Sequence, residues 1–292
     1  MVLGRRPDPA GLAAAIARER VTAVWAGSPS WVHKLVDAAQ EDDESDLTSL
    51  TVVMFSWGAM RPDLGARLRR ACGERVHMLE VFGQTEAMSC YRFWPDRHPD
   101  KFEQSLRGVN HVGAPNPMLA ADIVDAEGRS LRGRPGEAGE AVYRSPVLTA
   151  GYYKDEAATA EAFRDGWFHS GDSCAYDQDG MQIMVDRYKD IVKSGGENIS
   201  SLRVEGVLAA HPDIERVAVI GIPDAEWGER VTAVVTSRAD RDLDTAELIE
   251  FARARLAGHE TPKQIVVVDR MPETVGGKIM KYKLRELIGG AG

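Results

Sequence analysis

The feature that most constrains the fold is the alternation of helical and strand patterns in the first part of the chain. Helix-like segments alternate with short β-branched runs in the order 9–20 (helix), 21–25 (strand), 30–40 (helix), 50–55 (strand), 63–72 (helix) and 76–81 (strand). Strands that alternate with helices are typical of a parallel sheet covered by helices. We therefore expect an α/β layer over residues 1–110.

Two further changes of pattern divide the rest of the chain. Short alternating strands (ADIVD, EAVYRS) with Gly and Pro turns follow, and they predict a small antiparallel, barrel-like sheet over 111–187. Helices and strands then mix within about a hundred residues, which predicts a compact α+β carboxy-terminal domain over 188–292. The predicted fold class is α/β: a large domain, 1–187, made of a partial parallel layer and a small β-barrel-like subdomain, followed by that small domain.

Composition and charge exclude several function classes. Hydrophobic residues make up 43% and charged residues 28%, which is ordinary globular usage. The net charge of −9, without a strongly basic stretch, gives no support for a nucleic-acid partner. Cys72, Cys90 and Cys174 lack the spacing of a zinc site or a redox pair, which fits a reducing compartment. Because the chain has no signal-peptide pattern and no apolar run near ~18 residues, we expect a cytoplasmic protein without a membrane span.

Two clusters in the first two thirds of the chain carry groups suited to a nucleotide. VFGQTEAM ends a hydrophobic strand with Thr85 and Glu86, and ligands of open α/β sheets lie beyond the carboxyl ends of the strands. These residues are placed to hold a phosphate and its magnesium, although a solvated strand-to-loop turn is the simpler alternative. In WFHSGD, Asp172 follows a tight Ser-Gly turn, where a fixed carboxylate can accept both hydroxyls of a ribose. A polar hairpin loop is the alternative there.

Two more clusters lie closer to the carboxy terminus. In DRYKDIVKSGGENI, Arg187 offers a planar fork of donors, and Gly195 with Gly196 permits close backbone approach by a ligand. A solvated interdomain linker is the alternative. In GGKIMKYKLRE, Lys278 is a flexible point charge that can settle on a carboxylate or phosphate oxygen in a transition state. The alternative is an ordinary charged helix end, and a Walker loop is excluded because no Ser or Thr follows the lysine.

In this order, the four clusters resemble the motifs of the adenylate-forming (AMP-binding) superfamily, which includes acyl-CoA synthetases, aryl-CoA ligases, luciferases and peptide-synthetase adenylation domains. FGQTE resembles its aromatic-G-x-T-E motif, WFHSGD its ribose-aspartate motif, DRYKDIVKSGGENIS its hinge motif and GGKIMKYKLRE its terminal lysine motif. VLTAGYYKDEAATAEAF resembles the segment that precedes the ribose aspartate. The resemblance runs from about Pro9 to Ile288.

The resemblance implies roles for five residues around ATP. Phe82 would stack on adenine, Thr85 would contact the α-phosphate, and Glu86 would hold magnesium. Asp172 would bind the ribose hydroxyls with the assistance of Arg187. The resemblance also implies that a carboxylic acid is first converted to an acyl-adenylate and then transferred to a thiol.

The remaining matches concern the mobile domain and coenzyme A. Lys278 matches the lysine needed for adenylation, so the candidate catalytic residues are Lys278, Thr85 and Glu86. Lys189 matches the hinge about which the small domain turns, and Gly195 and Gly196 would line the pantetheine route. SGGENIS resembles acyl-CoA ligases rather than peptide-synthetase domains, which implies coenzyme A as the acceptor. The candidate nucleotide-binding set is completed by Gly58, Ala59, Lys193 and Asn198.

The chain departs from the family pattern in several places. The family has a loop rich in Ser, Thr and Gly that closes with Pro-Lys and grips the β- and γ-phosphates, and these 292 residues contain no such segment. We therefore expect roughly the carboxy-terminal half of a synthetase, without full activity by itself. In SWGAMRP, Trp57 and Met60 stand where small residues or Pro are usual. Ser170 replaces Thr, and Arg203 replaces the first acid of an E-x-E pattern whose second acid is Glu205.

The leading hypothesis is a partial chain of an acid-CoA ligase that acts on a fatty or aryl acid with ATP, Mg²⁺ and coenzyme A. One alternative is a non-catalytic module that binds AMP or an acyl-adenylate, and another is a coenzyme A-binding scaffold. A subunit of a split enzyme also fits, with the amino-terminal half or a second copy as its partner. The pattern leaves the acid open, because the acyl pocket depends on packing around Trp57 and Met88.

Overall fold

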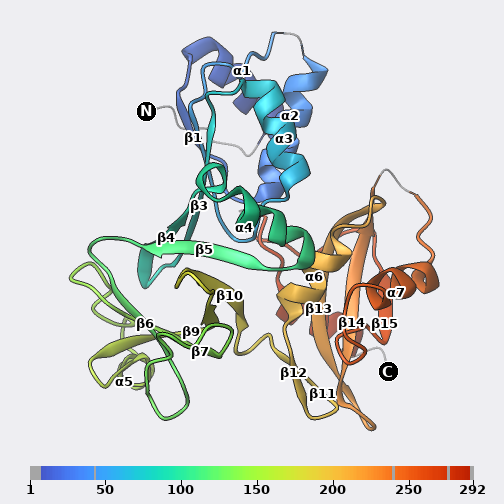
Figure 1. The fold of residues 1–292 in the computed structure, drawn as a ribbon. Helices are drawn as coiled ribbons and strands as arrows, with labels where there is room; N and C mark the ends of the chain where they lie inside the picture. Colours follow the sequence, from blue (N-terminus) through green and yellow to red (C-terminus); the bar gives the residue numbers. More distant parts are fainter. Residues whose placement is uncertain (1–7, 43, 239–240, 275–276, 290–292) are drawn as a thin grey trace. The chain divides into compact units, whose positions relative to one another are not determined.

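The computed structural model describes residues 8–42, 44–238, 241–274 and 277–289 (Figure 1). The chain divides into two compact units. Unit 1 comprises residues 1–105 and 111–116, and unit 2 comprises residues 106–110 and 117–292. The boundary predicted between residues 187 and 188 lies within unit 2 and stays a prediction.

Unit 1 contains the predicted α/β layer. Its strands run in the order β1-β2-β3-β4-β5, in which β1, β2 and β3 are parallel and β4 and β5 are added in antiparallel fashion. The strands are β1 (Ala23–Trp25), β2 (Val52–Phe55), β3 (His77–Gln84), β4 (Ala87–Phe93) and β5 (Asn110–Pro115). The helices are α1 (Pro9–Glu19), α2 (Pro29–Glu41), α3 (Pro62–Cys72) and α4 (Pro99–Glu103), with 3-10 turns at η1 (Pro95–Arg97) and η2 (Gln104–Arg107).

Local sequence signals set the boundaries of these helices. A proline lies in the first turn of α1, α2 and α3, where a missing N–H leaves no hydrogen bond unmade. Asp8 caps α1, because its Oδ2 accepts the N–H of Gly11 at 3.1 Å. Gly73 follows the end of α3 with a φ of +87°, a conformation that favours glycine.

Unit 2 begins with an antiparallel sheet in the order β10-β9-β7-β6. Its members are β6 (Ala120–Val124), β7 (Ala138–Arg144), β9 (Trp167–Tyr176) and β10 (Gln182–Arg187), with the short β8 (Phe163–Arg164) paired to β9 and with α5 (Glu156–Ala162) before it. Antiparallel pairing agrees with the alternating sequence pattern. Among the described residues, these strands form an open sheet and no closed barrel.

The rest of unit 2 is the predicted compact α+β region. Its sheet runs in the order β12-β11-β14-β13, and β15 pairs in parallel with β14. The strands are β11 (Val192–Ser194), β12 (Glu197–Ile199), β13 (Ile214–Asp224), β14 (Gly228–Ser237) and β15 (Gln264–Val267). The helices are α6 (Ser201–Leu208), α7 (Thr245–Arg253) and α8 (Lys281–Gly289).

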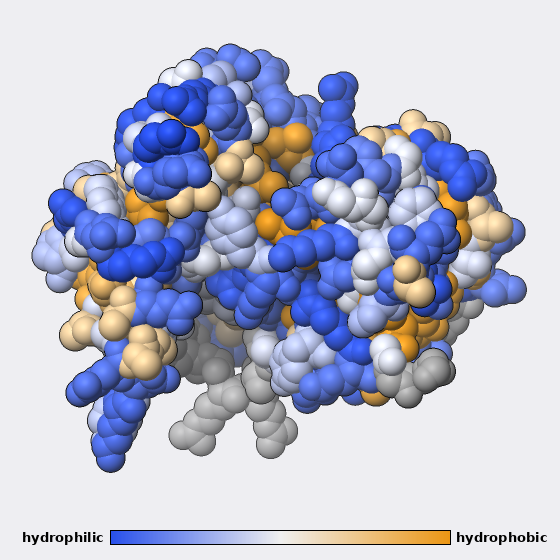
Figure 2. Space-filling view, turned by 90° about the horizontal axis from the view of Figure 1, so that it is seen from below, coloured by the Kyte–Doolittle hydropathy of each residue, from blue (hydrophilic) through white to orange (hydrophobic). Residues whose placement is uncertain are grey.

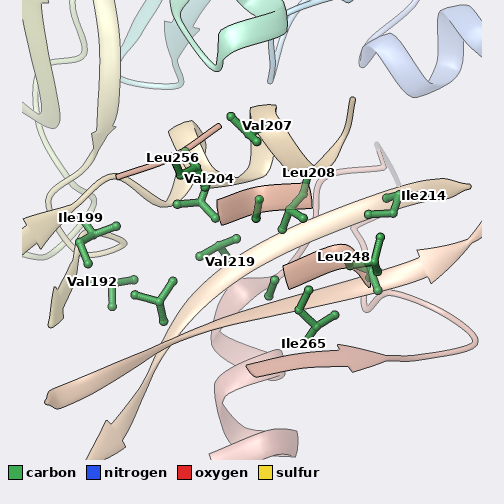
Figure 3. Close-up of a cluster of buried hydrophobic side chains, with 14 residues drawn as sticks. Val192, Ile199, Val204, Val207, Leu208, Ile214, Val219, Leu248, Leu256 and Ile265 are labelled. Atoms are coloured by element: carbon green, nitrogen blue, oxygen red, sulfur yellow. The ribbon is translucent and has the colours of Figure 1, made fainter. Parts of the chain in front are cut away.

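Side chains on both faces of β13 and β14 are buried. On one face, Val219 packs with side chains of α6 and α7 in the cluster drawn in Figure 3. On the other face, Ile220 packs with Leu284 of α8. A strand buried on both faces needs a continuous apolar run, which explains why VAVIGI lacks polar alternation.

The face of the molecule seen in Figure 2 is mainly polar. Hydrophilic residues cover most of the face shown in Figure 2, and hydrophobic residues form small groups among them. None of the helices in the described residues combines the length and the apolar character that a membrane span requires.

A buried ion cluster joins β10, α6, α8 and β13. The ammonium of Lys281 lies 2.7 Å from the carboxylate of Glu205 and donates to Ser201 Oγ at 2.6 Å. Asp186, at the end of β10, accepts both the N–H and the O–H of Ser201. Glu205 also accepts the N–H of Val219 at 2.7 Å. Burial opposes the charged form of Lys281, but the charges of Glu205 and Asp186 outweigh it and raise the lysine's pKa.

This cluster gives a stability prediction. Replacement of Lys281 with Met removes the one cation among two buried carboxylates, and an uncompensated buried charge costs about 3–5 kcal/mol. We expect Lys281→Met to lower the free energy of unfolding of unit 2 by that amount, measured by urea denaturation at pH 7. The matched control is Lys283→Met on the exposed face of α8, where about 0.5 kcal/mol or less is expected. Equal losses in the two variants would contradict the prediction.

Candidate functional site

The centre of the candidate site in unit 2 is the ion pair between Asp172 on β9 and Arg187 at the end of β10. The two residues are register partners in the sheet, and Arg187 Nε donates to Asp172 Oδ1 at 3.1 Å. Asp172 is only 2% exposed, whereas Arg187 is half-buried. Burial raises the pKa of Asp172 to about 6, against the opposing effects of Arg187 and then Lys278. The site therefore holds a carboxylate that is mostly ionised at neutral pH but gains its proton at a higher pH than an ordinary aspartate.

Asp172 lies in a β-bulge. Along β7, the step from Glu140 to Val142 covers two positions, while their partners on β9 are Ser173 and His169, four positions apart. The residues from 170 to 172 are thus displaced from regular pairing, and Gly171 has a φ of +69°. The sequence predicted a tight Ser-Gly turn here. That prediction is wrong, because β7 pairs with β9 on both sides of the glycine and keeps it inside one strand of ten residues.

Lys278 lies in the loop that leads into α8. An isolated bridge between Glu273 and Ile279 closes this loop. Arg216 on β13 reaches it, donating to the carbonyl of Gly277 at 3.0 Å and lying 2.6 Å from the carboxylate of Glu273. The preceding glycine of the GGK motif, at position 276, lies outside the described residues.

Lys278 shares its electrostatic environment with the ion pair. Partial desolvation lowers the pKa of the Lys278 ammonium, and the charges of Arg187 and Lys189 lower it further. Asp172 and Asp190 act in the opposite direction. Lys278 and Asp172, which are far apart in the sequence, therefore lie near each other in unit 2. A cationic side chain beside a buried carboxylate and a guanidinium is an arrangement that can neutralise the charge of an anionic ligand.

In sequence, the predicted hinge residue lies between the two sheets of unit 2, and the predicted coenzyme A residues lie at the start of the second sheet. Lys189 is exposed and comes two residues after the end of β10. Gly195 and Gly196 form the two-residue connection between β11 and β12, with φ values of +61° and +84°. Two positive φ values are what such a tight hairpin requires, which explains the glycine pair. Lys193 and Asn198 face each other across this hairpin and are both exposed.

The remaining candidates lie in unit 1. Thr85 and Glu86 form the two-residue connection between β3 and β4, so they lie at the tip of an antiparallel hairpin. Phe82 packs edge-on against Tyr91 of β4, with ring centroids 6.2 Å apart. No group of three or more His, Cys, Asp or Glu side chains in the described part of the chain could enclose a metal. A single carboxylate such as that of Glu86 suits a cation that completes its shell with phosphate oxygens and water, as Mg²⁺ does.

The residues of the SWGAMRP loop that differ from the family pattern have distinct environments in the structure. Trp57 adopts a φ of +67°, a conformation that costs a non-glycine residue energy, and is half exposed. Its ring packs edge-on against Trp25, with centroids 6.3 Å apart. A Cβ added to Gly58 would meet nothing within 4 Å, so open space lies beside it, whereas Met60 is fully buried. Ala59, between them, is half-buried.

Sequence reasoning missed the side chains that hold these groups in place. They are Glu140, Asp186, Ser201, Arg216 and Lys281. One signal was available, because Asp186 occupies a buried position of a strand that alternates buried and half-buried residues. The departure at the E-x-E pattern also has a structural account: Arg203 pairs with Glu260 at 2.7 Å, while Glu205 binds the buried lysine.

The chain is similar to known proteins over nearly its whole length. A feruloyl-CoA synthase from Amycolatopsis sp is 35% identical over 282 residues, which cover 97% of this chain and 55% of that relative. The medium/long-chain-fatty-acid–CoA ligase FadD8 of Mycobacterium tuberculosis is 32% identical over 292 residues, with 98% and 49% covered. The structure of amide bond synthetase McbA from Marinactinospora thermotolerans matches with a TM-score of 0.84 and 33% identity, covering 96% of this chain and 55% of that one. The chain spans about half the length of the relatives it matches.

Family patterns cover both units. Residues 203–278 match the pattern described as AMP-binding enzyme C-terminal domain. Residues 1–153, more than half of the 292, match the pattern described as AMP-binding enzyme. The chain therefore belongs to the AMP-binding family of adenylate-forming enzymes.

Proposed function

We propose that this chain is the carboxy-terminal part of an AMP-forming acid-CoA ligase. The observation that carries the proposal is the grouping of Asp172, Arg187 and Lys278 in unit 2. A ribose needs an acceptor for its hydroxyls, and a triphosphate needs a cation at the bond that breaks. One buried carboxylate, one guanidinium and one partly desolvated ammonium meet both needs.

The proposed reaction has two steps. A carboxylate oxygen of the acid attacks the α-phosphorus of ATP, and the bond to pyrophosphate breaks to give an acyl-adenylate. The thiol of coenzyme A then attacks the acyl carbon, and AMP leaves with the bonding electrons. Lys278 and Thr85 would stabilise the negative charge on the phosphoryl oxygens in the first step. Mg²⁺, when bound at Glu86, would supply further charge neutralisation.

The two half-reactions need different groups at the same place. We infer that the segment after Lys189 turns as a body, carrying Lys278 away and bringing the Gly195-Gly196 hairpin toward the acyl-adenylate. The exposure of Lys189 and the tightness of that hairpin support this hinge. Lys193 and Asn198, beside the two glycines, would then line the nucleotide or acyl group.

We assign the acid and the acceptor from the relatives and from the SGGENIS motif, and not from the shape of a pocket. Feruloyl-CoA synthase and FadD8 are named for an aryl and a fatty acid, and we propose a fatty or aryl acid for this chain. The acyl wall would include Gly58 and Ala59. The SGGENIS motif favours coenzyme A, although McbA is named for forming an amide bond.

We further propose a cytoplasmic setting and a partner. The relatives are about twice as long as this chain, so the amino-terminal half of such an enzyme or a second copy would complete the site. The competing function is a module that binds AMP or an acyl-adenylate without catalysis.

Nucleotide binding tests the ribose assignment. AMP should bind the wild-type chain, and Asp172→Ala should weaken it by about tenfold or more, because charge-assisted hydrogen bonds to the hydroxyls are lost. Isothermal titration calorimetry measures both affinities, with Asp177→Ala in a neighbouring loop as the matched control. The same affinity in wild type and Asp172→Ala would refute the assignment.

The raised pKa of Asp172 gives a pH dependence. Ribose hydroxyls donate best to the ionised carboxylate, so affinity should rise as pH increases through about 6, where Asp172 loses its proton. Adenosine is the suitable probe because it has no phosphate that titrates in this range. Its affinity should increase about tenfold between pH 5 and pH 8, and Asp172→Asn should show a flat profile. A flat wild-type profile would contradict the assignment.

The raised pKa of Asp172 also affects stability. The Asp172 carboxyl binds more protons in the folded chain than in the unfolded chain at pH values between the two pKa values. Its contribution therefore lowers the free energy of unfolding progressively as pH rises from about 4 to about 6, and the effect is constant above that.

Exchange of labelled pyrophosphate into ATP tests the catalytic proposal. We expect no acid-dependent exchange by this chain alone, because its sequence lacks the segment that grips the β- and γ-phosphates in the family. Exchange should appear when the polypeptide corresponding to the preceding half of its relatives is added, and Lys278→Ala should abolish it. Robust exchange by the chain alone would show that the phosphate-gripping loop is dispensable. Its absence from the reconstituted pair would favour the non-catalytic module.

A further inference from the structure

Glu140 on β7 lies directly beside the bulge that carries Asp172. Its Oε1 accepts the N–H of Gly171 at 3.1 Å. Its other oxygen, Oε2, lies 2.7 Å from Nδ1 of His169 and 3.1 Å from Nη2 of Arg164. The Glu140 carboxylate is mostly buried, with a side-chain exposure of 18%. One carboxylate therefore contacts the bulge main chain and the residue on its amino-terminal side.

Ser170 makes a second attachment to the same strand. Its hydroxyl donates to the carbonyl of Ala141 at 2.6 Å and accepts the N–H of Asp172 at 3.1 Å. A bulge leaves backbone groups of the strand without their ladder partners. Here Glu140 takes the N–H of Gly171, and Ser170 takes that of Asp172. Both acceptors are tied to β7, since Glu140 belongs to that strand and the Ser170 hydroxyl donates to its residue Ala141.

From this geometry we propose that Glu140 is a positioning residue that fixes the direction of the Asp172 carboxylate toward the ribose. The inference rests on the proposed nucleotide-binding function. Gly171 has a φ of +69° and no Cβ, so its backbone has other conformations available if its N–H is released. Any rotation there moves the Asp172 side chain, which follows in the next peptide unit. His169 and Arg164 hold the Glu140 carboxylate from the other side, which limits its own rotamers.

A positioning role differs from a general structural role in what it changes. The two ribose hydroxyls are the only ligand groups assigned to Asp172, so misplacement of its carboxylate should remove the preference for AMP over 2′,3′-dideoxy-AMP. Affinity for the dideoxy compound should not change, since its adenine and phosphate contacts do not involve Asp172. Loss of the fold would instead lower both affinities together.

The test measures both affinities by isothermal titration calorimetry in four proteins. Wild type should prefer AMP by about tenfold, and Glu140→Ala should bind the two nucleotides equally. Glu140→Gln, which keeps an acceptor for Gly171, should retain part of the preference. The matched control is Glu137→Ala, an exposed carboxylate close by in the chain that pairs with Arg134 at 3.5 Å, and it should behave as wild type. An unchanged preference in Glu140→Ala, or an equal fall in both affinities, would overturn the proposal.

Amide hydrogen exchange supplies a readout that needs no ligand. The peptide containing Gly171 and Asp172 should exchange at least tenfold faster in Glu140→Ala than in wild type or Glu137→Ala, because one N–H loses its acceptor.

If wild type bound neither nucleotide, the proposed nucleotide function would fail, and unchanged exchange would overturn the positioning role separately. If Glu140→Ala did not fold, Glu140→Gln would decide, with a reduced AMP preference supporting the proposal and an unchanged one overturning it.

Discussion

The arrangement of unit 2 depends on one buried ammonium. Lys281 holds Glu205 directly and reaches Asp186 through Ser201, so a single cation links α8, α6 and the end of β10. A buried charge is tolerated only when its partners are in place, so the Lys281–Glu205 pair fixes the placement of α8 relative to α6. Lys278 lies three residues before Lys281. Its position near Asp172 therefore follows from where the buried cluster fixes the start of α8.

The proposed hinge at Lys189 separates one member of this cluster from the other three. Asp186 precedes Lys189 in the chain, whereas Ser201, Glu205 and Lys281 all follow it. Rotation about the hinge would leave the Lys281–Glu205 pair intact within the moving body. It would break the hydrogen bonds from Ser201 to Asp186 and the one from Ser200 to the carbonyl of Val185. The moving body thus keeps its own charge compensation. Asp186, left at the end of β10, would have to find water or another donor, which favours the conformation with Lys278 near Asp172.

The sequence predicted the elements well and the supporting side chains poorly. Periodicity predicted the alternation of the α/β layer and the regular strands of unit 2, because burial of one or two faces determines those patterns. The Ser-Gly pair before Asp172 was misinterpreted as a turn, since the same residues serve a bulge when a neighbouring strand pairs on both sides. Glu140 and Arg216 carry no motif. Their roles depend on which strands are neighbours, and local sequence does not contain that information.

The charges around Asp172 connect the two proposed half-reactions. Burial raises its pKa, and Arg187 and Lys278 oppose that rise, so its ionised state near neutral pH depends partly on the lysine. Movement of Lys278 away from the site would remove one of the two opposing cations and raise the pKa of Asp172 further. A protonated Asp172 is a poorer acceptor for ribose hydroxyls. The rotation that brings coenzyme A toward the acyl group would therefore also weaken the hold on the nucleotide that must leave after the second step.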